Sequence, residues 1–394
     1  MKHLIIGCGI SGIHIAIQLL DKGINGEDIL ILEKSPYNYS KIFTIKDDVT
    51  RDNGNREEIT LELGPSVFHS KQKELMRLIE RLNLLDTLVN VNPKEKAYFV
   101  YPKMTSDEAK NKWKELKKIV LEEGDKELTL KEASKRILNK EEYNLLKTCW
   151  GEWYEVCDCN LRILKKSLEE EGDYIIMKGG LDQIIKTGIK FLEERKVNIK
   201  FEHQVINITE DLIITDIKGN TYNPEKLYIC TNYKGAKSIK NNIPLLKEYL
   251  SSGKSKQCTR FYVYFKKDIN IPYKFIMGKF LGKYSIKTSE RLWLIAYPDD
   301  VLSEYLNNIP KVNIIKDWLK MINYNFDLKL KLKDIGGDYY MYWDDAYTIL
   351  KNNKLNQVQQ IYNELKNKGI IITSLPKDKG ENSAWMEGHL FNID

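Results

Sequence analysis

Three glycines near the N-terminus have the spacing of a phosphate-binding turn. Gly7, Gly9 and Gly12 form the pattern G-x-G-x-x-G, with Ser11 inside it, between an apolar run at 2–6 and helical periodicity over 13–20. The first glycine of such a turn permits a tight bend, the second lets the backbone approach a pyrophosphate, and the third allows a helix to pack closely on a strand. The amides at the N-terminus of the following helix would then face the phosphates.

An acidic residue follows at the distance that this turn requires. Glu33 lies 21 residues after Gly12, at the end of a second apolar run at 28–33. A carboxylate at this place accepts hydrogen bonds from both hydroxyls of an adenosine ribose, and it would repel a 2′-phosphate. The strand–helix–strand unit therefore predicts dinucleotide binding, with a unit that has lost its ligand as the alternative. These residues alone do not separate FAD from NAD.

The remaining chain alternates between helical and strand patterns, as the chain of an α/β protein does. Region 37–58 shows no clear periodicity, and we expect a long loop or an irregular hairpin there. Helices are expected at 71–88, in several charged segments of 105–170, and at 181–194, 312–323 and 354–367. Strands are expected at 59–63, 174–177, 197–201, 205–209, 212–217, 227–230, 260–265, 291–297 and 369–373.

The bulk composition is that of an ordinary globular protein of 394 residues, with 42% hydrophobic and 30% charged residues. The net charge of +6 is spread along the chain without a basic tail, which argues against a nucleic-acid partner. Six scattered cysteines predict reduced thiols in the cytoplasm, and five histidines without ligand spacing predict no metal site. We expect no membrane span, because no stretch approaches about 18 uninterrupted apolar residues. The oligomeric state stays open.

Further landmarks, in the same order along the chain, resemble the flavin-containing amine oxidoreductase family, which includes monoamine and polyamine oxidases. Segment 62–69 (ELGPSVFH) is similar to a flavin-contacting segment of that family. Segment 177–185, with its double glycine, resembles the start of the family's central helix, and 203–205 falls on its adenine-side strand. Segment 340–347 looks like the aromatic stretch beside the substrate, and 385–388 like the closing segment at the flavin.

The resemblance implies an FAD cofactor and a small-molecule substrate, an amine. We expect the FAD to be bound without a covalent link, because no cysteine lies in the family's C-terminal attachment region. The residues assigned to FAD, those of the glycine turn included, are Gly7, Gly9, Ser11, Gly12, Glu33, Lys34, Lys41, Gly64, Pro65, Ser66, Val205, Trp385 and Met386.

The same resemblance assigns His69, Trp343 and Tyr347 to the catalytic pocket. Trp343 and Tyr347 are four residues apart, so on a helix they would share one face and could hold an amine between aromatic walls by cation–π attraction. His69 would be a polar pocket group or a proton acceptor. The alternative interpretation is structural, with core aromatics and a hydrogen-bonded histidine.

Three features depart from the family's pattern. Lys41 stands where the family has an arginine, so a point charge replaces a bidentate contact. Segment 373–375 (TSL) stands where the family has an Ala-Gly-Glu run. The chain also ends at Asp394, only a few residues into the expected terminal helix. FAD binding would tolerate these departures better than turnover would.

We therefore expect a Rossmann-like FAD-binding α/β fold with an interleaved substrate or cap domain. Residues 1–90, 171–250 and 346–394 would form the FAD-binding domain, and residues 91–170 and 251–345 the substrate/cap domain. The first hypothesis for function is an FAD-dependent oxidoreductase that oxidises the C–N bond of an amine by hydride transfer to flavin N5. The second is a catalytically weak or inactive flavoprotein with a binding or structural role, and the third is an NAD-linked enzyme.

Overall fold

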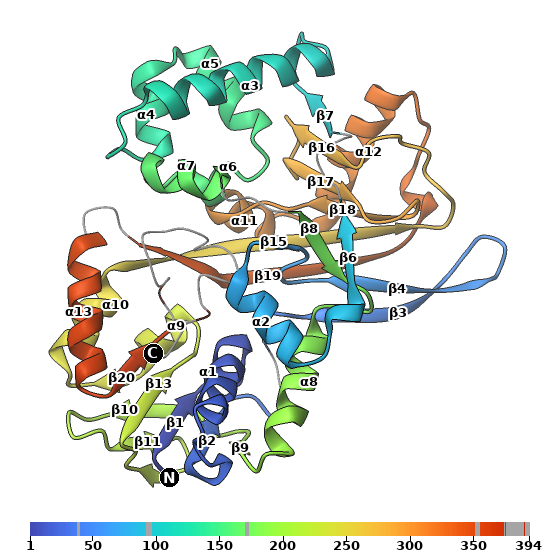
Figure 1. Ribbon diagram of the computed structural model, residues 1–394. Helices are drawn as coiled ribbons and strands as arrows, with labels where there is room; N and C mark the ends of the chain where they lie inside the picture. Colours follow the sequence, from blue (N-terminus) through green and yellow to red (C-terminus); the bar gives the residue numbers. More distant parts are fainter. Residues whose placement is uncertain are drawn as a thin grey trace.

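A five-stranded parallel sheet contains the N-terminal strand of the chain. The computed structural model describes residues 1–37, 40–91, 97–169, 173–350, 355–373, 375 and 390. The strand order is β20-β13-β1-β2-β9, and every neighbouring pair runs parallel (Figure 1). Helix α1 connects β1 to β2, which confirms the predicted strand–helix–strand unit. The elements are β1 (His3–Ile6), α1 (Ile10–Asp21), β2 (Ile29–Leu32), β9 (Asn198–Lys200), β13 (Lys226–Ile229) and β20 (Ile370–Ile372).

Both faces of this sheet are buried, as in parallel sheets that are covered by helices. On one face Ile5 and Ile31 pack in a core with side chains of α1, α2 and α8. On the other face Leu4 and Leu30 pack with side chains of α9, α10 and α13. The two cores hold the glycine turn between β1 and α1 at the carboxyl edge of the sheet. The added helices are α2 (Lys73–Arg81), α8 (Asp182–Glu193), α9 (Tyr233–Ser238), α10 (Pro244–Ser251) and α13 (Leu355–Asn367).

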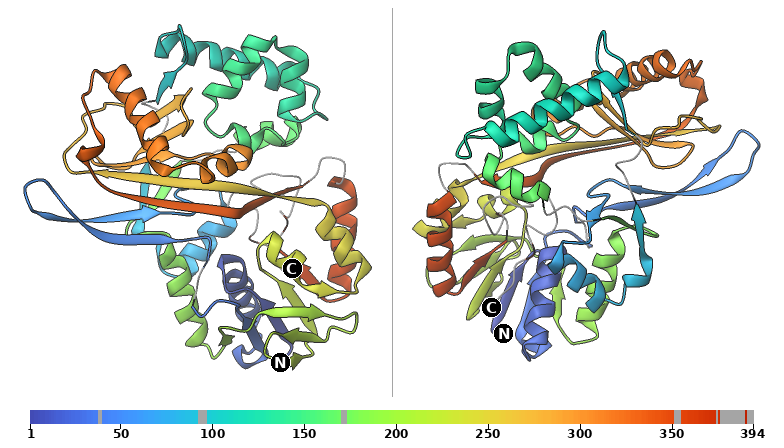
Figure 2. Two further views of the ribbon diagram at one scale, coloured as in Figure 1. Left: turned by 180° about the vertical axis from the view of Figure 1, so that it is seen from behind. Right: turned by 45° about the horizontal axis from the view of Figure 1, so that its top comes forward.

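A six-stranded mixed sheet crosses the middle of the molecule in the order β19-β15-β18-β17-β16-β7 (Figure 2). Hairpin β3–β4 packs on one face through Leu61, and helix α12 packs on the other through Trp318. The strands are β7 (Ala97–Val100), β15 (Gly253–Phe265), β16 (Phe275–Gly278), β17 (Tyr284–Lys287), β18 (Leu292–Ala296) and β19 (Ile335–Leu350). The covering elements are β3 (Thr44–Thr50), β4 (Arg56–Glu62), α11 (Asp300–Asn307) and α12 (Lys311–Phe326).

Helices α3 to α7 lie together at the end of the molecule opposite the N-terminus (Figure 1). Their starts are set locally, because Thr105 and Glu108 form a capping box on α3, and Thr129 and Glu132 form one on α4. The predicted helical character of 105–170 is confirmed for the described residues. The helices are α3 (Ser106–Glu123), α4 (Leu130–Ile137), α5 (Lys140–Cys149), α6 (Trp153–Val156) and α7 (Leu161–Glu169).

Two smaller sheets and short 3-10 turns join these layers. The four-stranded sheet consists of β10 (Val205–Ile208), β11 (Ile214–Asp216), β12 (Thr221–Tyr222) and β14 (Lys240–Asn241). The three-stranded sheet consists of β5 (Phe68–His69), β6 (Leu88–Val91) and β8 (Tyr174–Met177). The 3-10 turns are η1 (Gly26–Asp28), η2 (Leu85–Thr87) and η3 (Leu332–Asp334).

The structure corrects three expectations about local structure. Much of region 37–58 belongs to a regular hairpin, since β3 and β4 pair in unbroken register from Thr44 opposite Glu62 to Thr50 opposite Arg56. Its strands carry many charged residues on the exposed side, which hides the alternation in the sequence. Trp343 and Tyr347 lie on strand β19 and not on a helix. The helix expected at 71–88 is shorter, since only α2 and the 3-10 turn η2 form within that range.

None of the described helices combines the length and apolar character that a membrane span needs. The six cysteines are all free thiols. Within the described ranges, no group of three or more His, Cys, Asp or Glu side chains is placed to hold a metal ion. The two-domain division of the chain stays a prediction.

Candidate functional site

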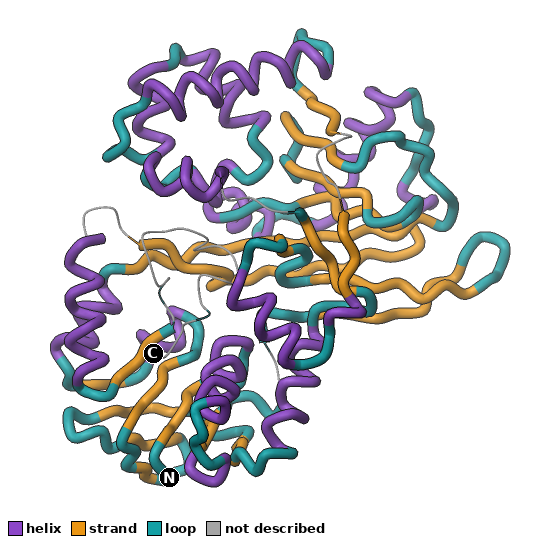
Figure 3. Tube along the Cα trace, viewed as in Figure 1, coloured by secondary structure: helices purple, strands orange, loops and turns teal. Residues whose placement is uncertain are grey.

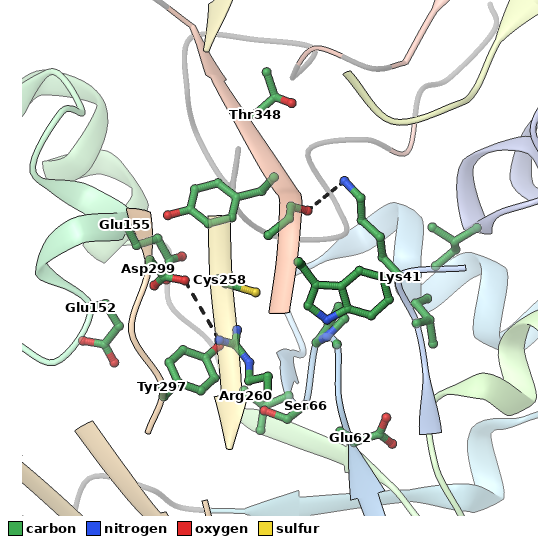
Figure 4. A pocket seen from close by; sticks show the side chains of 18 of the residues that line it. Lys41, Glu62, Ser66, Glu152, Glu155, Cys258, Arg260, Tyr297, Asp299 and Thr348 are labelled. Atoms are coloured by element: carbon green, nitrogen blue, oxygen red, sulfur yellow. Dashed lines mark hydrogen bonds and ion pairs between the residues drawn. The ribbon is translucent and has the colours of Figure 1, made fainter. Parts of the chain in front are cut away.

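A cavity of about 1410 Å³ extends from the glycine turn to strands β15 and β19. Pockets for a single small ligand occupy roughly 300–1,000 Å³, so this cavity has room for a dinucleotide and a second molecule. Its walls come from segments far apart in the chain, among them the β1–α1 turn, the 62–69 segment, helix α3 and β19. Figure 4 shows the part of the cavity around Lys41, Cys258 and Arg260.

The glycine turn has the geometry that its three glycines predict. Gly7 has a φ of +104°, and a Cβ atom there would lie 2.8 Å from the carbonyl oxygen of Cys230. A Cβ at Gly12 would lie 2.0 Å from the carbonyl oxygen of Gly7, so only glycine fits behind the turn. Gly9 borders the cavity, and a Cβ there would meet no atom within 4 Å. Gly9 is therefore the glycine at which a ligand would approach the backbone.

The N-terminus of α1 borders this cavity, and no side chain of the described residues caps it. Gly9 is the N-cap residue, no side chain caps the helix, and its first turn contains no acidic residue. The first amides of a helix lack intrahelical acceptors, and the helix dipole gives them a partial positive charge. Ser11, also on the cavity wall, lies in this first turn. The arrangement suits an anionic group such as a pyrophosphate.

Glu33 lies at the end of β2 on the cavity wall and is 8% exposed. One carboxylate oxygen accepts a hydrogen bond from the backbone amide of Cys8 at 2.9 Å, and the other accepts one from Ser35 at 2.9 Å. Each oxygen keeps a further acceptor position, since a carboxylate accepts about four hydrogen bonds. The glycine turn and Glu33 are thus fixed to each other, with capacity left for a ligand.

His203 is a polar wall residue near Glu33 in segment 203–205, of which the sequence analysis assigned only Val205 to the cofactor. Its backbone amide donates to the carbonyl of Glu33 at 2.8 Å, and its Nδ1 lies 2.6 Å from a carboxylate oxygen of Asp216. Asp216 is fully buried and also accepts hydrogen bonds from Tyr222 and Asn220. These contacts fix the imidazole at the end of the cavity that also contains Val205.

Segment 62–69 crosses the cavity between the two large sheets. Gly64 permits this, because a Cβ there would lie 1.8 Å from the carbonyl oxygen of Lys41. Gly64, Pro65, Ser66 and His69 all border the cavity, and His69 is buried. The predicted flavin-contacting segment therefore lies on the same wall as the glycine turn.

Glu62 is the first residue of this segment, and its pKa is raised. Its carboxylate accepts hydrogen bonds from the backbone amide of Leu181 at 2.7 Å and from the hydroxyl of Thr44 at 2.9 Å. Burial raises the pKa of Glu62 to about 7, although both hydrogen bonds favour the ionised form. The group therefore titrates near neutral pH on the wall of the cavity.

Lys41 also borders the cavity, at the place where the family resemblance implies an arginine. Its ammonium group donates to the backbone carbonyl of Ala346 at 2.8 Å (Figure 4). Burial lowers the pKa of Lys41, and the nearby carboxylates of Asp345 and Asp344 oppose that shift. Lys41 thus links the loop after β2 to strand β19.

Trp343 and Tyr347 both line the cavity, although a strand and not a helix positions them. Side chains four apart on a strand lie on one face unless a bulge intervenes, and here the pairing of β15 with β19 shifts between Lys256 and Cys258. The indole N–H of Trp343 donates to the carbonyl of Leu63. The hydroxyl of Tyr347 is buried and has no hydrogen-bond partner among the described residues.

A buried polar cluster next to these aromatics was missed at the sequence level. Arg260 on β15 lies against Tyr297 and Asp299, and Glu155 of α6 faces Asp299 (Figure 4). Burial raises the pKa of Glu155, and the neighbouring Asp299 raises it further. Burial also raises the pKa of Asp299, against the opposing effect of Arg260. The available signal was an arginine inside a strongly apolar strand pattern.

The structure brings most of the predicted site residues to one cavity. Thirteen residues of the prediction border it: Gly7, Gly9, Ser11, Glu33, Lys34, Lys41, Gly64, Pro65, Ser66, His69, Val205, Trp343 and Tyr347. Gly12 lies behind the turn and not on the wall. Trp385 and Met386 fall outside the described residues. The roles of all these residues in binding and catalysis remain predictions.

Residues 10–158 match the family model of flavin containing amine oxidoreductases. The matched stretch begins at α1 and includes Glu33, Lys41 and the 62–69 segment. The match confirms, over residues 10–158, the family resemblance that was inferred from the sequence motifs. A search of curated proteins finds no match to this chain.

Proposed function

We propose that this protein binds FAD without a covalent link and oxidises the C–N bond of an amine. The observation that carries the proposal is the single cavity that joins a dinucleotide-type turn to an aromatic and polar wall on β15 and β19. The family match supports the flavin, and the uncapped N-terminus of α1 beside Glu33 supports the dinucleotide form. In this proposal residues 1–90, 171–250 and 346–394 contribute the cofactor side.

The residues of the glycine turn would hold the pyrophosphate, and Glu33 would accept hydrogen bonds from the adenosine ribose. Bound FAD would supply the acceptor for a hydride equivalent from the carbon beside the substrate nitrogen. Gly64, Pro65 and Ser66 would place backbone against the cofactor, since they cross the same cavity.

The aromatic wall would receive the amine. Trp343 and Tyr347 present ring surface that excludes water and attracts a cationic nitrogen through the ring quadrupole. His69 would act as a polar pocket group or a proton acceptor, which helps to keep the amine in its unprotonated, reactive form. Orientation and desolvation are thus the contributions of the chain's own residues.

A second candidate is a flavoprotein with weak or no turnover and a binding or structural role. The observation that favours it is the hydrogen bond from Lys41 to Ala346, since the cation at this position is already engaged by the protein. An NAD-linked enzyme is a third candidate, and the family match to flavin proteins argues against it.

The first experiment is an absorbance spectrum of the purified protein, followed by heat release and identification of any chromophore. Released FAD supports the proposal and leads to a screen of amines with detection of hydrogen peroxide. FAD without turnover on any amine favours the second candidate. A colourless protein that takes up no added FAD would overturn the proposal.

A further inference from the structure

Helix α3 presents a row of lysines to the cavity. Lys110, Lys114 and Lys118 recur every four residues on this helix, and all three border the cavity. Side chains at this spacing are neighbours on one face of a helix. The face of α3 that packs in the core is a different one, which contains Leu116 and Val120. Helix α3 is therefore fixed in the core on one side and lines the cavity with another.

The positive charge of this row is not neutralised by the described part of the chain. None of the three lysines forms an ion pair with another described residue, and Glu122 is the one acidic residue of α3 that borders the cavity. Glu108 is used elsewhere, because it caps the N-terminus of the helix. Lys165 on α7 adds a further cation to the same wall. A wall with this excess of positive charge attracts anions and raises their local concentration.

Aromatic and aliphatic surface lies beside the lysines. The ring centre of Trp113 on α3 lies 5.5 Å from that of Phe99 and 6.2 Å from that of Trp150. All three rings border the cavity, and so do Leu121 of α3 and Leu168 of α7. Trp113 and the two leucines are only partly buried. The wall therefore combines cations with apolar surface that a ligand could remove from water.

Lysine, and not arginine, supplies the charge of this wall. A lysine ammonium is a point charge on a flexible stem, so it binds phosphate oxygens without the fixed fork of a guanidinium. A phosphate monoester has close to two negative charges at neutral pH, so it interacts favourably with several separate cations. The neighbouring apolar surface matches a hydrocarbon chain attached to such a head group.

This wall is separate from the glycine turn. Helices α3 and α7 lie at the end of the molecule away from α1 (Figure 1), and Gly9 of the turn is the N-cap residue of α1. The cavity of about 1410 Å³ also exceeds the roughly 300–1,000 Å³ of a pocket for one small ligand. A ligand at α3 and a dinucleotide at the turn can therefore be bound together.

We propose that the wall formed by α3 and α7 binds an amphiphilic phosphate, which is a hydrocarbon chain with a phosphate head group. The lysines of the row and Lys165 would hold the phosphate, and the chain would cover Trp113, Leu121 and Leu168. The inference goes beyond the proposed function, because it requires neither bound FAD nor an oxidisable amine.

The test compares single-chain ligands that differ in their head group. Octyl phosphate, octyltrimethylammonium and octyl glucoside are titrated into the purified protein below their micelle concentrations, with isothermal calorimetry as the readout. We expect octyl phosphate to bind at least about tenfold more tightly than either of the others, since only its head group is complementary to the lysines. Equal binding of the three ligands, or tighter binding of octyltrimethylammonium, overturns the inference.

A chain-length series tests the apolar part of the site. The affinity should rise from butyl to hexyl to octyl phosphate, by at least about threefold for each two carbons, because every added methylene group leaves water. Inorganic phosphate should bind more weakly than any of these. A series without a trend would mean a site for the bare anion, which contradicts the inference.

Two variants assign the preference to the lysine row. The α3 variant combines Lys110→Gln, Lys114→Gln and Lys118→Gln. The control variant combines three exposed lysines of the same helical region that do not border the cavity, as Lys126→Gln, Lys131→Gln and Lys140→Gln. Both variants lower the net charge equally, so only the position of the lysines differs. The α3 variant should bind octyl phosphate at least about tenfold more weakly, and the control should bind it as the unmodified protein does.

Circular dichroism checks the fold of both variants. An α3 variant that is folded and still prefers octyl phosphate, or an equal loss in the control, contradicts the inference. Failure of the proposed function gives a different result, because the titrations are carried out with and without added FAD. A chain that takes up no FAD but loses its octyl phosphate preference only in the α3 variant supports the inference and overturns the flavoprotein proposal.

Discussion

The three glycines of the turn have different roles, because the space around each of them differs. Gly7 and Gly12 are constrained by backbone atoms of the protein, whereas Gly9 is adjacent only to the cavity. The first two are required for the fold of the turn, and the third leaves room for a ligand. A methyl group at each position therefore tests a different property.

Replacing Gly9 by alanine should leave folding nearly unchanged and weaken FAD binding. The new Cβ meets no protein atom within 4 Å, and the φ of −80° suits any residue, so the change in unfolding free energy should stay within about 0.5 kcal/mol. FAD affinity should fall at least about tenfold, because the methyl group occupies the approach to the pyrophosphate. Urea unfolding and flavin titration measure the two effects.

The control for this change is Gly337→Ala on β19, where a Cβ is equally unhindered and away from the cavity. It should alter neither stability nor FAD binding. Unchanged FAD affinity in Gly9→Ala would contradict the assignment of Gly9 to the cofactor.

The raised pKa of Glu62 makes stability depend on pH. A carboxyl group with a pKa of about 7 in the folded state and a lower pKa in the unfolded state stabilises the fold when it is protonated. This contribution is complete at pH values below the pKa of the unfolded state, and it is lost as the pH rises through about 7. Glu62→Gln should therefore reduce the stability difference between about pH 5 and about pH 8 by about 2–3 kcal/mol. Urea unfolding of the FAD-free protein at both pH values measures it.

Glu58→Gln on the same strand is the matched control, since Glu58 is exposed. Its pH dependence should equal that of the unmodified protein. If Glu62→Gln behaves in the same way as this control, the buried carboxyl does not titrate as described.

At the scale of elements, hairpin β3–β4 and strand β19 position the site from opposite sides. The hairpin ends at Glu62, so its docking on the six-stranded sheet sets where segment 62–69 crosses the cavity. The hydroxyl of Tyr262 on β15 donates to the carbonyl of Glu62 at 2.9 Å, which fixes this end. Strand β19 supplies the aromatic wall and the acceptor for Lys41.

Leu61→Ala tests the docking of the hairpin. Leu61 is 1% exposed and packs in the core shared with β15 and β18, so the variant should lose about 2–5 kcal/mol of unfolding free energy. The exposed Leu85 gives a control, and Leu85→Ala should change stability by less than about 0.5 kcal/mol. Equal effects in thermal or urea unfolding would mean that the hairpin is not packed on the sheet.

At the scale of the whole molecule, the cavity depends on contacts between the two large sheets. The glycine turn belongs to the parallel sheet, Arg260 and Trp343 belong to the mixed sheet, and helix α3 closes part of the wall. A ligand that fills this space contacts both sheets. Binding should therefore stabilise the whole folded chain.

FAD at about 100 times its dissociation constant should raise the unfolding free energy by about 2.7 kcal/mol. FMN, which lacks the adenosine part and the pyrophosphate, should stabilise much less at the same concentration, because Glu33 and the N-terminus of α1 would have no partner. NAD should also have little effect. Thermal unfolding with each ligand provides the comparison, and equal stabilisation by FMN and FAD would contradict the dinucleotide assignment.

The sequence by itself determined the features whose cause is local or periodic. The glycine spacing, the position of Glu33 and the apolar runs of β1 and β2 specify the strand–helix–strand unit, because side-chain sterics and burial act within a few residues there. The capping boxes of α3 and α4 are equally local. The family resemblance also depends only on the order of motifs, and most of the residues that it assigned to the site border the cavity.

Only the tertiary structure decided which distant residues meet. Strand β15 places Arg260 in the cavity opposite Glu155 of α6, and no spacing along the chain relates those two elements. Pairing with β15 fixes residues 343–347 as a strand. The helix considered for Trp343 and Tyr347 was therefore wrong, because their four-residue spacing does not by itself distinguish a helix from a strand. Burial against groups that are remote in sequence also sets the pKa values of Glu62 and Glu155. Long-range packing determines these properties, and it is not encoded in any short segment.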